Sequence, residues 1–162
     1  MSLDFAFSVA NSASLLCWVL LIGFPRARLT YLLAYRLGVP LMFAVAYLVL
    51  LVVGRDAFAH GGGFASLAQV MTLFTYRAAV LAGWLHYLAF DLFVGTRISR
   101  DSRRLGMPAW QVAPALLLTF MLGPVGLLTY AVQRRFWPEQ QRRLAKAEIV
   151  GKTRGRAGVE RH

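Results

Sequence analysis

Four stretches of this chain run for about 20 residues almost without a charged side chain. They cover about residues 5–24, 35–54, 78–95 and 110–132. An apolar helix of roughly 20 residues matches the hydrocarbon core of a bilayer. Within lipid, the backbone satisfies its hydrogen bonds only in a helix or in a closed barrel. Because the alternating pattern of a membrane barrel is absent, the sequence predicts an all-α integral membrane bundle of four transmembrane helices.

The composition favours a membrane protein over soluble classes. Hydrophobic residues make up 58% of the 162 residues and charged residues 15%, whereas a soluble domain has about a quarter of its residues charged. The only cysteine, Cys17, cannot support a disulfide scaffold, and no zinc, P-loop or dinucleotide-binding motif occurs. We therefore expect no metal site. The net charge of +11 comes from arginines at the ends of apolar segments, so no nucleic-acid partner is expected.

The segments around the spans predict a short helix and a basic tail. Residues 64–74, with the sequence FASLAQVMTLF, form an amphipathic stretch too short to cross a bilayer, which we expect at the membrane interface before the third span. Residues 1–133 are predicted to be the transmembrane domain. Residues 134–162 are predicted to be a basic tail, helical from Pro138 to about Val150 and then disordered.

The arginines give conflicting signals for orientation. Residues 26–36, 97–104 and 134–146 are all rich in arginine, and basic loops favour the cytoplasmic side. With four complete spans, the third of these segments falls on the opposite side from the first two. One alternative is a re-entrant hairpin in place of the fourth span, broken at Pro114, Gly123, Pro124 and Gly126. Four spans are favoured, which leaves the orientation open, and we expect a multi-pass protein of the cell inner membrane.

Ionisable side chains inside apolar segments are costly, so each is a functional candidate. The third span and its approach contain Arg77, His86 and Asp91. At 100° per residue, Arg77, Trp84 and Asp91 fall on one stripe. His86 lies about 140° from Asp91 by the same geometry. The two side chains therefore cannot pair within one helix and share a cavity only if other helices bring partners to both.

These candidates also have structural interpretations. Asp91 lies one turn before Gly95, where it could form an ion pair with Arg97 or Arg36. His86 could be a neutral histidine that is hydrogen-bonded to a neighbouring helix. Asn11 lies on one face of the first span with other polar side chains, a pattern typical of interhelical hydrogen bonds. The Gly-Pro-x-Gly break at residues 123–126 is interpreted as a feature that shapes the chain without chemistry.

The third span and the segments beside it resemble a known family. The residues that carry the resemblance are WLHYLAFDLFVG (84–95), the arginine-rich connection after it, and APALLLTFMLGPVGLLTY (113–130), and FASLAQVMTLF also fits. They resemble the abscisic-acid-deficient-four-like family of small membrane proteins. Plant members of that family are plastid proteins needed to make neoxanthin from violaxanthin. The resemblance is most specific over residues 64–130.

The resemblance implies isomerisation of a long polyene lipid without a redox cofactor. Opening an epoxide to an allenic alcohol needs an acid at the oxygen and a base at a neighbouring carbon. His86 and Asp91 would carry this work, and Trp84, Tyr87 and Phe90 would pack against the polyene. Further candidate binding residues are Asn11 and Arg77. Candidate structural residues are Gly95, Gly123, Pro124 and Gly126. For a bacterial member, the expected ligand is another carotenoid or isoprenoid.

A second interpretation belongs to a different functional class. The chain could be a non-catalytic membrane partner, or a subunit that holds a pigment in a larger complex. Under both interpretations the expected partners are membrane lipids and a carotenoid or isoprenoid ligand, with a homodimer or other membrane proteins as further candidates. Transport of small solutes is less favoured, because no internal repeat is evident.

Overall fold

The computed structural model describes residues 2–36, 38–138 and 141, and this part of the chain is all-helical. The elements are α1 (Leu3–Gly23), α2 (Arg28–Thr30), the π-helical η1 (Tyr31–Tyr35), α3 (Gly38–Val53), α4 (Asp56–Ala59), α5 (Leu67–Leu73), α6 (Arg77–Arg104) and α7 (Ala109–Leu122). Residues 124–138 are also helical. The all-α prediction is therefore confirmed over the described residues.

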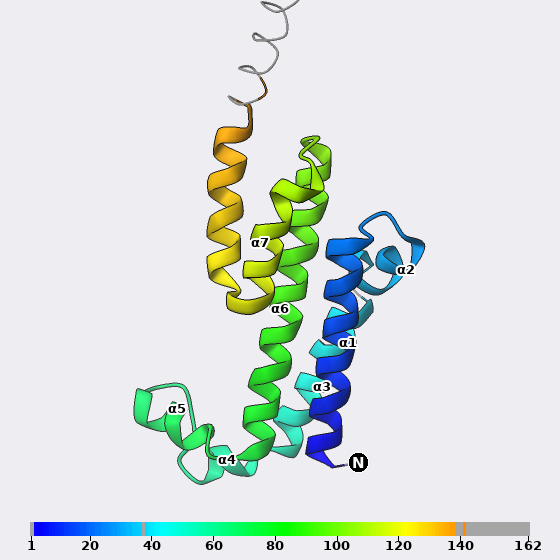
Figure 1. The fold of residues 1–162 in the computed structure, drawn as a ribbon. Helices are drawn as coiled ribbons and strands as arrows, with labels where there is room; N and C mark the ends of the chain where they lie inside the picture. The colour runs from blue at the N-terminus through cyan, green and yellow to red at the C-terminus, as the bar shows by residue number, and fades with distance from the viewer. Residues whose placement is uncertain (1, 37, 139–140, 142–162) are drawn as a thin grey trace, which may run out of the picture.

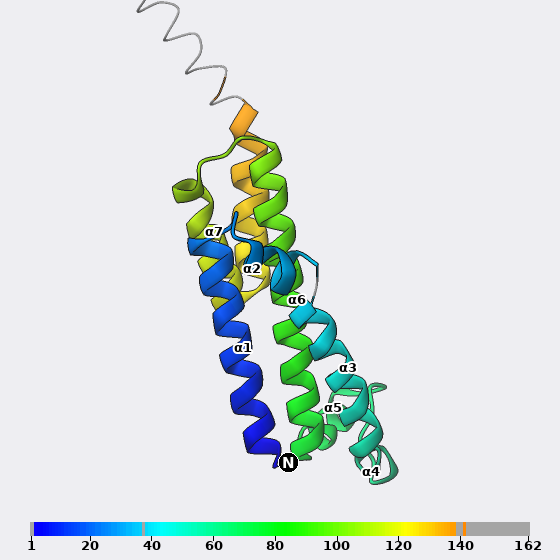
Figure 2. The ribbon, with the colours of Figure 1, turned by 90° about the vertical axis from the view of Figure 1, so that its right-hand side faces the viewer.

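α6 is the central helix, and α1, α3 and α7 all pack against it (Figure 1; Figure 2). Leu92 of α6 is fully buried in the core beside Trp18 and Leu21 of α1, and Phe43 of α3 is buried in the same cluster. Gly95 permits the close approach of α1, since a Cβ at this position would lie 2.5 Å from the Trp18 indole. The chain thus builds its core around one side of a single long helix.

Among the described residues, three helices are long and apolar enough to cross a membrane: α1, the stretch Arg28–Val53 that includes η1 and α3, and α6. They correspond to the first three predicted spans. α6 continues past the predicted end of the third span at Gly95, to Arg104. Arginine is a good helix former, and the helix stops only where Gly106 adopts a φ of +67°.

The fourth predicted span, about residues 110–132, is not one helix. α7 ends at Leu122, Gly123 has a φ of +42°, and residues 124–138 run back beside α7 (Figure 1). Glycine tolerates a positive φ, and Pro124 suits the first turn of the returning helix because proline needs no partner for an amide proton. The four-span count is therefore not confirmed. Residues 109–138 form the hairpin that the sequence offered as an alternative, and residues 124–138 are its returning arm.

The two arms of the hairpin touch at Gly126. A Cβ at this position would overlap the backbone nitrogen and the hydroxyl of Thr119 in α7. Thr119 is fully buried, and its hydroxyl donates a hydrogen bond to the Ala115 carbonyl at 2.8 Å. Small residues at such contacts let helix backbones approach closely. Gly126 therefore sets the distance between the arms.

The basic segments gather at one end of the molecule (Figure 1). Arg103 near the end of α6 donates to the Pro25 carbonyl at 2.9 Å and lies 4.7 Å from the centre of the Tyr35 ring. Arg134 in the returning arm pairs with Asp101 at 2.9 Å. We call this region, made of residues 25–36, 97–104 and 130–138, the arginine end. Because the hairpin returns to its starting end, the described parts of the basic segments that conflicted in a four-span arrangement lie together.

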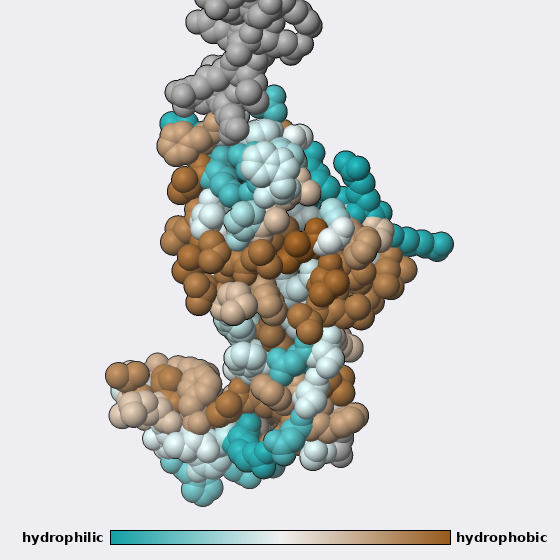
Figure 3. Space-filling view, viewed as in Figure 1, coloured by the Kyte–Doolittle hydropathy of each residue, from teal (hydrophilic) through white to brown (hydrophobic). Residues whose placement is uncertain are grey.

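The outer surface is rich in exposed hydrophobic side chains. Val45, Leu48 and Val52 of α3 are exposed, as are Met121 and Leu128 of the hairpin. Hydrophobic residues cover much of the face shown in Figure 3, and hydrophilic side chains project beside α2. Apolar helix surfaces of this kind match contact with lipid. The fold is that of a membrane protein.

The predicted short helix before the third span is present as α5. Ser66 caps it, since its hydroxyl accepts a hydrogen bond from the Gln69 amide at 3.3 Å. Phe64, Leu67 and Met71 are all exposed. The predicted tail helix to about Val150 and the final dozen residues lie outside the described residues, apart from its first residues at 138 and 141.

Candidate functional site

α6 presents a row of aromatic side chains toward α1. The Trp84 ring lies 5.8 Å from the Phe7 ring of α1 and 5.5 Å from the Tyr87 ring, measured between centroids. The Trp84 indole nitrogen donates a hydrogen bond to Asn11 Oδ1 at 2.9 Å. This bond is an interhelical hydrogen bond of the kind predicted for Asn11, whereas the Ser8 hydroxyl donates to the Asp4 carbonyl within α1. We call Phe7, Trp84 and Tyr87 the aromatic row.

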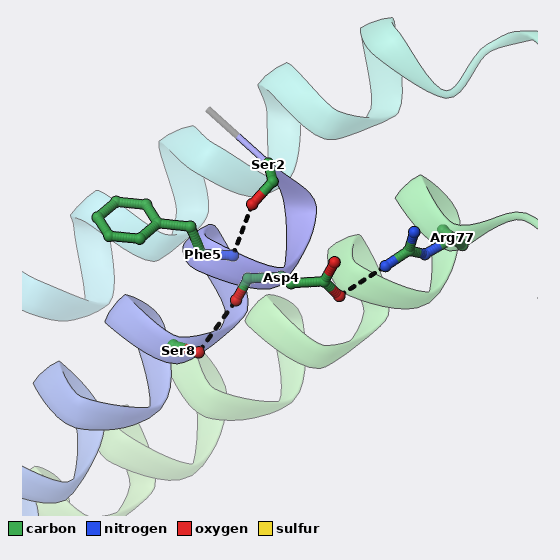
Figure 4. Close-up of polar contacts among 5 residues, drawn as sticks. All are labelled: Ser2, Asp4, Phe5, Ser8 and Arg77. Carbon is green, nitrogen blue, oxygen red and sulfur yellow. Dashed lines mark hydrogen bonds and ion pairs between the residues drawn. The ribbon is translucent and has the colours of Figure 1, made fainter.

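A groove of about 230 Å³ lies at one end of the aromatic row, between the first turns of α1 and α6. Phe7, Val80, Leu81 and Trp84 form its apolar wall. At its polar edge, Arg77 reaches across from α6 to Asp4 of α1, and the two side chains pair at 2.6 Å (Figure 4). Arg77 is therefore engaged in joining the two helices. The groove is open to the surroundings, because the Trp84 side chain is 38% exposed.

Asp91 lies at the other end of the row, against the tip of the hairpin. It is only 8% exposed, and a Cβ on Gly123 would lie 2.6 Å from its Oδ1. The Tyr87 phenol lies beside this carboxyl and donates a hydrogen bond to the Met121 carbonyl at 3.3 Å. Glycine at position 123 therefore serves twice: it permits the turn, and it leaves space for the carboxyl group.

Asp91 Oδ2 is buried and has no hydrogen-bond partner within the described part of the chain. The ion pairs formed there are Arg77–Asp4 and Arg134–Asp101. Asp91 therefore does not form the ion pair with Arg97 or Arg36 that its structural interpretation allowed. A buried carboxyl without a cation or a full set of hydrogen bonds is costly. Such a group inside an apolar helix is a functional candidate.

His86 lies on a different side of α6. Its ring stacks on Phe90 at 4.6 Å and lies 5.6 Å from the Tyr47 ring of α3. It lines a cavity of about 220 Å³ between α3, the α4–α5 segment and α6, with Phe58 and Phe64 among the other lining residues. The structure therefore does not bring His86 to Asp91, in agreement with their angular separation. Phe90 also belongs to the His86 side and not to the aromatic row.

Sequence reasoning missed two contacts of the hairpin. The first is the approach of Gly123 to Asp91. The second is at Asp101, whose Oδ2 accepts a hydrogen bond from the Tyr130 hydroxyl at 2.8 Å and pairs with Arg134 at 2.9 Å. The i,i+4 spacing of Tyr130 and Arg134 indicated that both lie on one face of a helix. Nothing in the sequence fixed which face of α6 they meet.

The comparisons with known proteins bear on the whole transmembrane region. A family model described as ABA DEFICIENT 4-like matches residues 5–130. The matched region includes the aromatic row, Asp91 and the turn at Gly123. Comparisons with curated proteins and with solved structures find no match.

Proposed function

The chain belongs to the ABA DEFICIENT 4-like family, and on that premise we propose that it binds a long isoprenoid, such as a carotenoid, and isomerises it by proton transfer at Asp91. The observation that carries this proposal is the buried carboxyl with an unpartnered Oδ2, placed where the aromatic row meets the hairpin. A proton-transfer group inside lipid needs a ligand that also resides there. An isoprenoid meets that condition.

The aromatic row suits a polyene for physical reasons. Aromatic faces bury large apolar area and stack against other π-systems. The adjoining groove holds about 230 Å³, which is smaller than a whole carotenoid, so much of the ligand would stay in the surrounding lipid. Entry would be lateral, past the exposed Trp84 ring. In this pose the ligand's polar end reaches Tyr87 and Asp91.

The proposed chemistry pairs Asp91 with Tyr87, because His86 faces a different cavity. The Tyr87 hydroxyl gives its proton to an epoxide oxygen of the ligand, and the Asp91 carboxylate takes a proton from a neighbouring carbon. The carbon–oxygen bond breaks as a carbon–carbon double bond forms. The proton then passes from Asp91 to Tyr87, which restores both groups. Atoms and electrons balance without an oxidant or a reductant.

The second candidate function is pigment holding without turnover. The cavity beside His86 favours it, because its lining combines aromatic rings from α3, the α4–α5 segment and α6. A ligand seated there would contact no carboxyl group of the kind described at Asp91. Under this alternative, His86 and Phe64 would matter for binding, and Asp91 would not.

We also infer an orientation in the cell inner membrane. With three crossing helices and a hairpin that returns, the arginine end lies wholly on one side, and basic segments favour the cytoplasm. The α3–α6 connection then lies on the outer side. A membrane-impermeant thiol reagent applied to intact cells should reach Ala59→Cys, which is exposed in that connection. Reaction only after permeabilisation would reverse the orientation.

The test of ligand binding is an extraction of the protein purified in mild detergent from a carotenoid-producing host. Absorbance and mass spectrometry of the extract should show about one isoprenoid per chain. Trp84→Ala should lose most of it, because the row loses its central ring. Trp110→Ala is the matched control, since Trp110 is 74% exposed at the start of α7 and lies outside the row. A clean wild-type extract, or equal retention by both variants, would contradict the proposal.

A further inference from the structure

A separate cavity lies between α6 and the returning arm, at the arginine end. Its volume is about 430 Å³. Three of its arginines, Arg97, Arg100 and Arg104, share one face of α6 because they are spaced at i, i+3 and i+7. Arg134 faces them from the returning arm. Four guanidinium groups therefore border one cavity.

The described residues do not neutralise the positive charge around this cavity. Asp101 is the one carboxylate in the lining, and it is already engaged by the Tyr130 hydroxyl and by Arg134. Arg97 and Arg104 are exposed and have no acidic partner among the described residues. The Arg100 guanidinium lies 5.3 Å from the centre of the Tyr35 ring. Within the described part of the chain, the guanidinium groups of Arg97 and Arg104 are thus available to an anion.

The other part of the lining is apolar. Phe93 and Leu127 border the cavity on the side toward the hairpin tip, and both are exposed. Phe93 precedes the arginines along α6, which runs from the apolar part of the molecule to the arginine end. One half of the cavity is therefore apolar and the other half is cationic. The guanidinium fork matches phosphate oxygens, and basic pockets between membrane helices suit lipid head groups.

We propose that this cavity binds a phosphate group carried on a long apolar chain. The phosphate lies between Arg97 and Arg104, and the chain follows Phe93 and Leu127 into the hydrocarbon. Two sources share this chemistry: an anionic phospholipid of the bilayer and a prenyl diphosphate. The site goes beyond the proposed isomerisation, since neither Asp91 nor the aromatic row contributes to it. Either proposal can therefore fail without the other.

The test is a titration of the purified full-length protein in detergent, followed by native mass spectrometry. The probes are phosphatidylglycerol, farnesyl diphosphate and inorganic pyrophosphate. The variant Arg97→Gln/Arg104→Gln removes the two free guanidinium groups. The control Arg26→Gln/Arg28→Gln removes the same charge from exposed positions at the same end, outside the cavity. We expect lipid binding to weaken at least about tenfold in the cavity variant and less than about twofold in the control.

Three other results would overturn parts of the proposal. Equal weakening in both variants would mean general attraction to a basic surface, and no weakening in either would mean no site. Pyrophosphate that binds as tightly as the two lipids would remove the role of the apolar chain. The relative affinity of phosphatidylglycerol and farnesyl diphosphate decides between the two sources. Unchanged far-UV circular dichroism and gel-filtration profiles are required of both variants, whose substituted side chains are all exposed.

Discussion

Asp91 and Asp101 are two carboxylates on the same helix, and both face the same hairpin, yet their surroundings differ. Asp101 meets the returning arm at the arginine end, where Tyr130 and Arg134 both engage its Oδ2. Asp91 meets the turn at Gly123, where its Oδ2 is buried without a partner. The hairpin thus supplies hydrogen-bond donors to one acid and only space to the other.

The difference separates a structural acid from a candidate catalytic one. A carboxylate that accepts hydrogen bonds from a neighbouring helix joins the two helices. Its contribution to the free energy of folding is about that of the hydrogen bonds it accepts. A buried carboxyl with an unpartnered oxygen lowers stability and persists where function needs it. The comparison therefore predicts opposite effects of neutralising the two acids, on activity in one case and on stability in the other.

The largest effect is expected for Asp91→Asn. The amide keeps the shape of the side chain but cannot accept a proton from carbon, so isomerisation should fall at least about a hundredfold. The measurement is the isomer composition of the isoprenoid retained by wild type and variant, resolved by chromatography. Asp101→Asn is the matched control and should leave the composition unchanged. If Asp91→Asn retained the wild-type composition, the pigment-holding alternative would replace the isomerase.

The next effect is on the hairpin itself. Gly126→Ala should lower the free energy of unfolding by about 1–3 kcal/mol, because the added methyl group overlaps Thr119 and forces the arms apart. Unfolding of the detergent-solubilised protein, followed by circular dichroism, would measure this. Gly23→Ala is the control, since a Cβ there meets nothing within 4 Å. Equal stability of the two variants would show that the arms do not touch at Gly126.

A smaller loss of stability is expected for Asp101→Asn. The substitution removes the ion pair with Arg134 and weakens the bond from Tyr130, which should cost about 1 kcal/mol. A double-mutant cycle with Arg134→Gln isolates the pair. Additive effects of the two substitutions would mean that Asp101 and Arg134 do not interact in solution.

The smallest effect is expected for Arg77→Gln. The pair with Asp4 is short (Figure 4), but its side chains are 71% and 78% exposed, and exposed ion pairs contribute at most about 1 kcal/mol. The same unfolding measurement should place this variant between wild type and Asp101→Asn. A larger loss than that of Asp101→Asn would show that this pair is shielded from water.

The helices could be predicted from sequence because their causes are local. Long apolar runs must be helical in lipid, and the angular separation of His86 and Asp91 follows from helix geometry alone. The path of residues 110–132 could not be settled in this way. Pro114, Gly123 and Pro124 permit both a kinked span and a turn. The turn brings Gly126 against Thr119, and no periodicity reveals this contact.

The candidate site was predictable only in part, for the same reason. Trp84 and Asp91 stand out because polar and aromatic residues at this spacing share a stripe of one helix. The partners of that stripe come from other elements: Asn11 from α1, and Gly123 from the hairpin. Sequence spacing describes one helix at a time, whereas the site is made of three.

The hairpin causes the contrast between Asp91 and Asp101. The most direct test is therefore to measure whether both ends of the hairpin lie on the same side of the membrane. Residues 109 and 135 are exposed and lie near opposite ends of the hairpin sequence. The variants Ala109→Cys and Arg135→Cys are each made in a Cys17→Ala background. Their reaction with an impermeant maleimide is compared in intact and in permeabilised cells. Both positions should react from the same side, opposite to Ala59→Cys. Reaction of positions 109 and 135 from opposite sides would mean a fourth crossing helix and would contradict the hairpin topology.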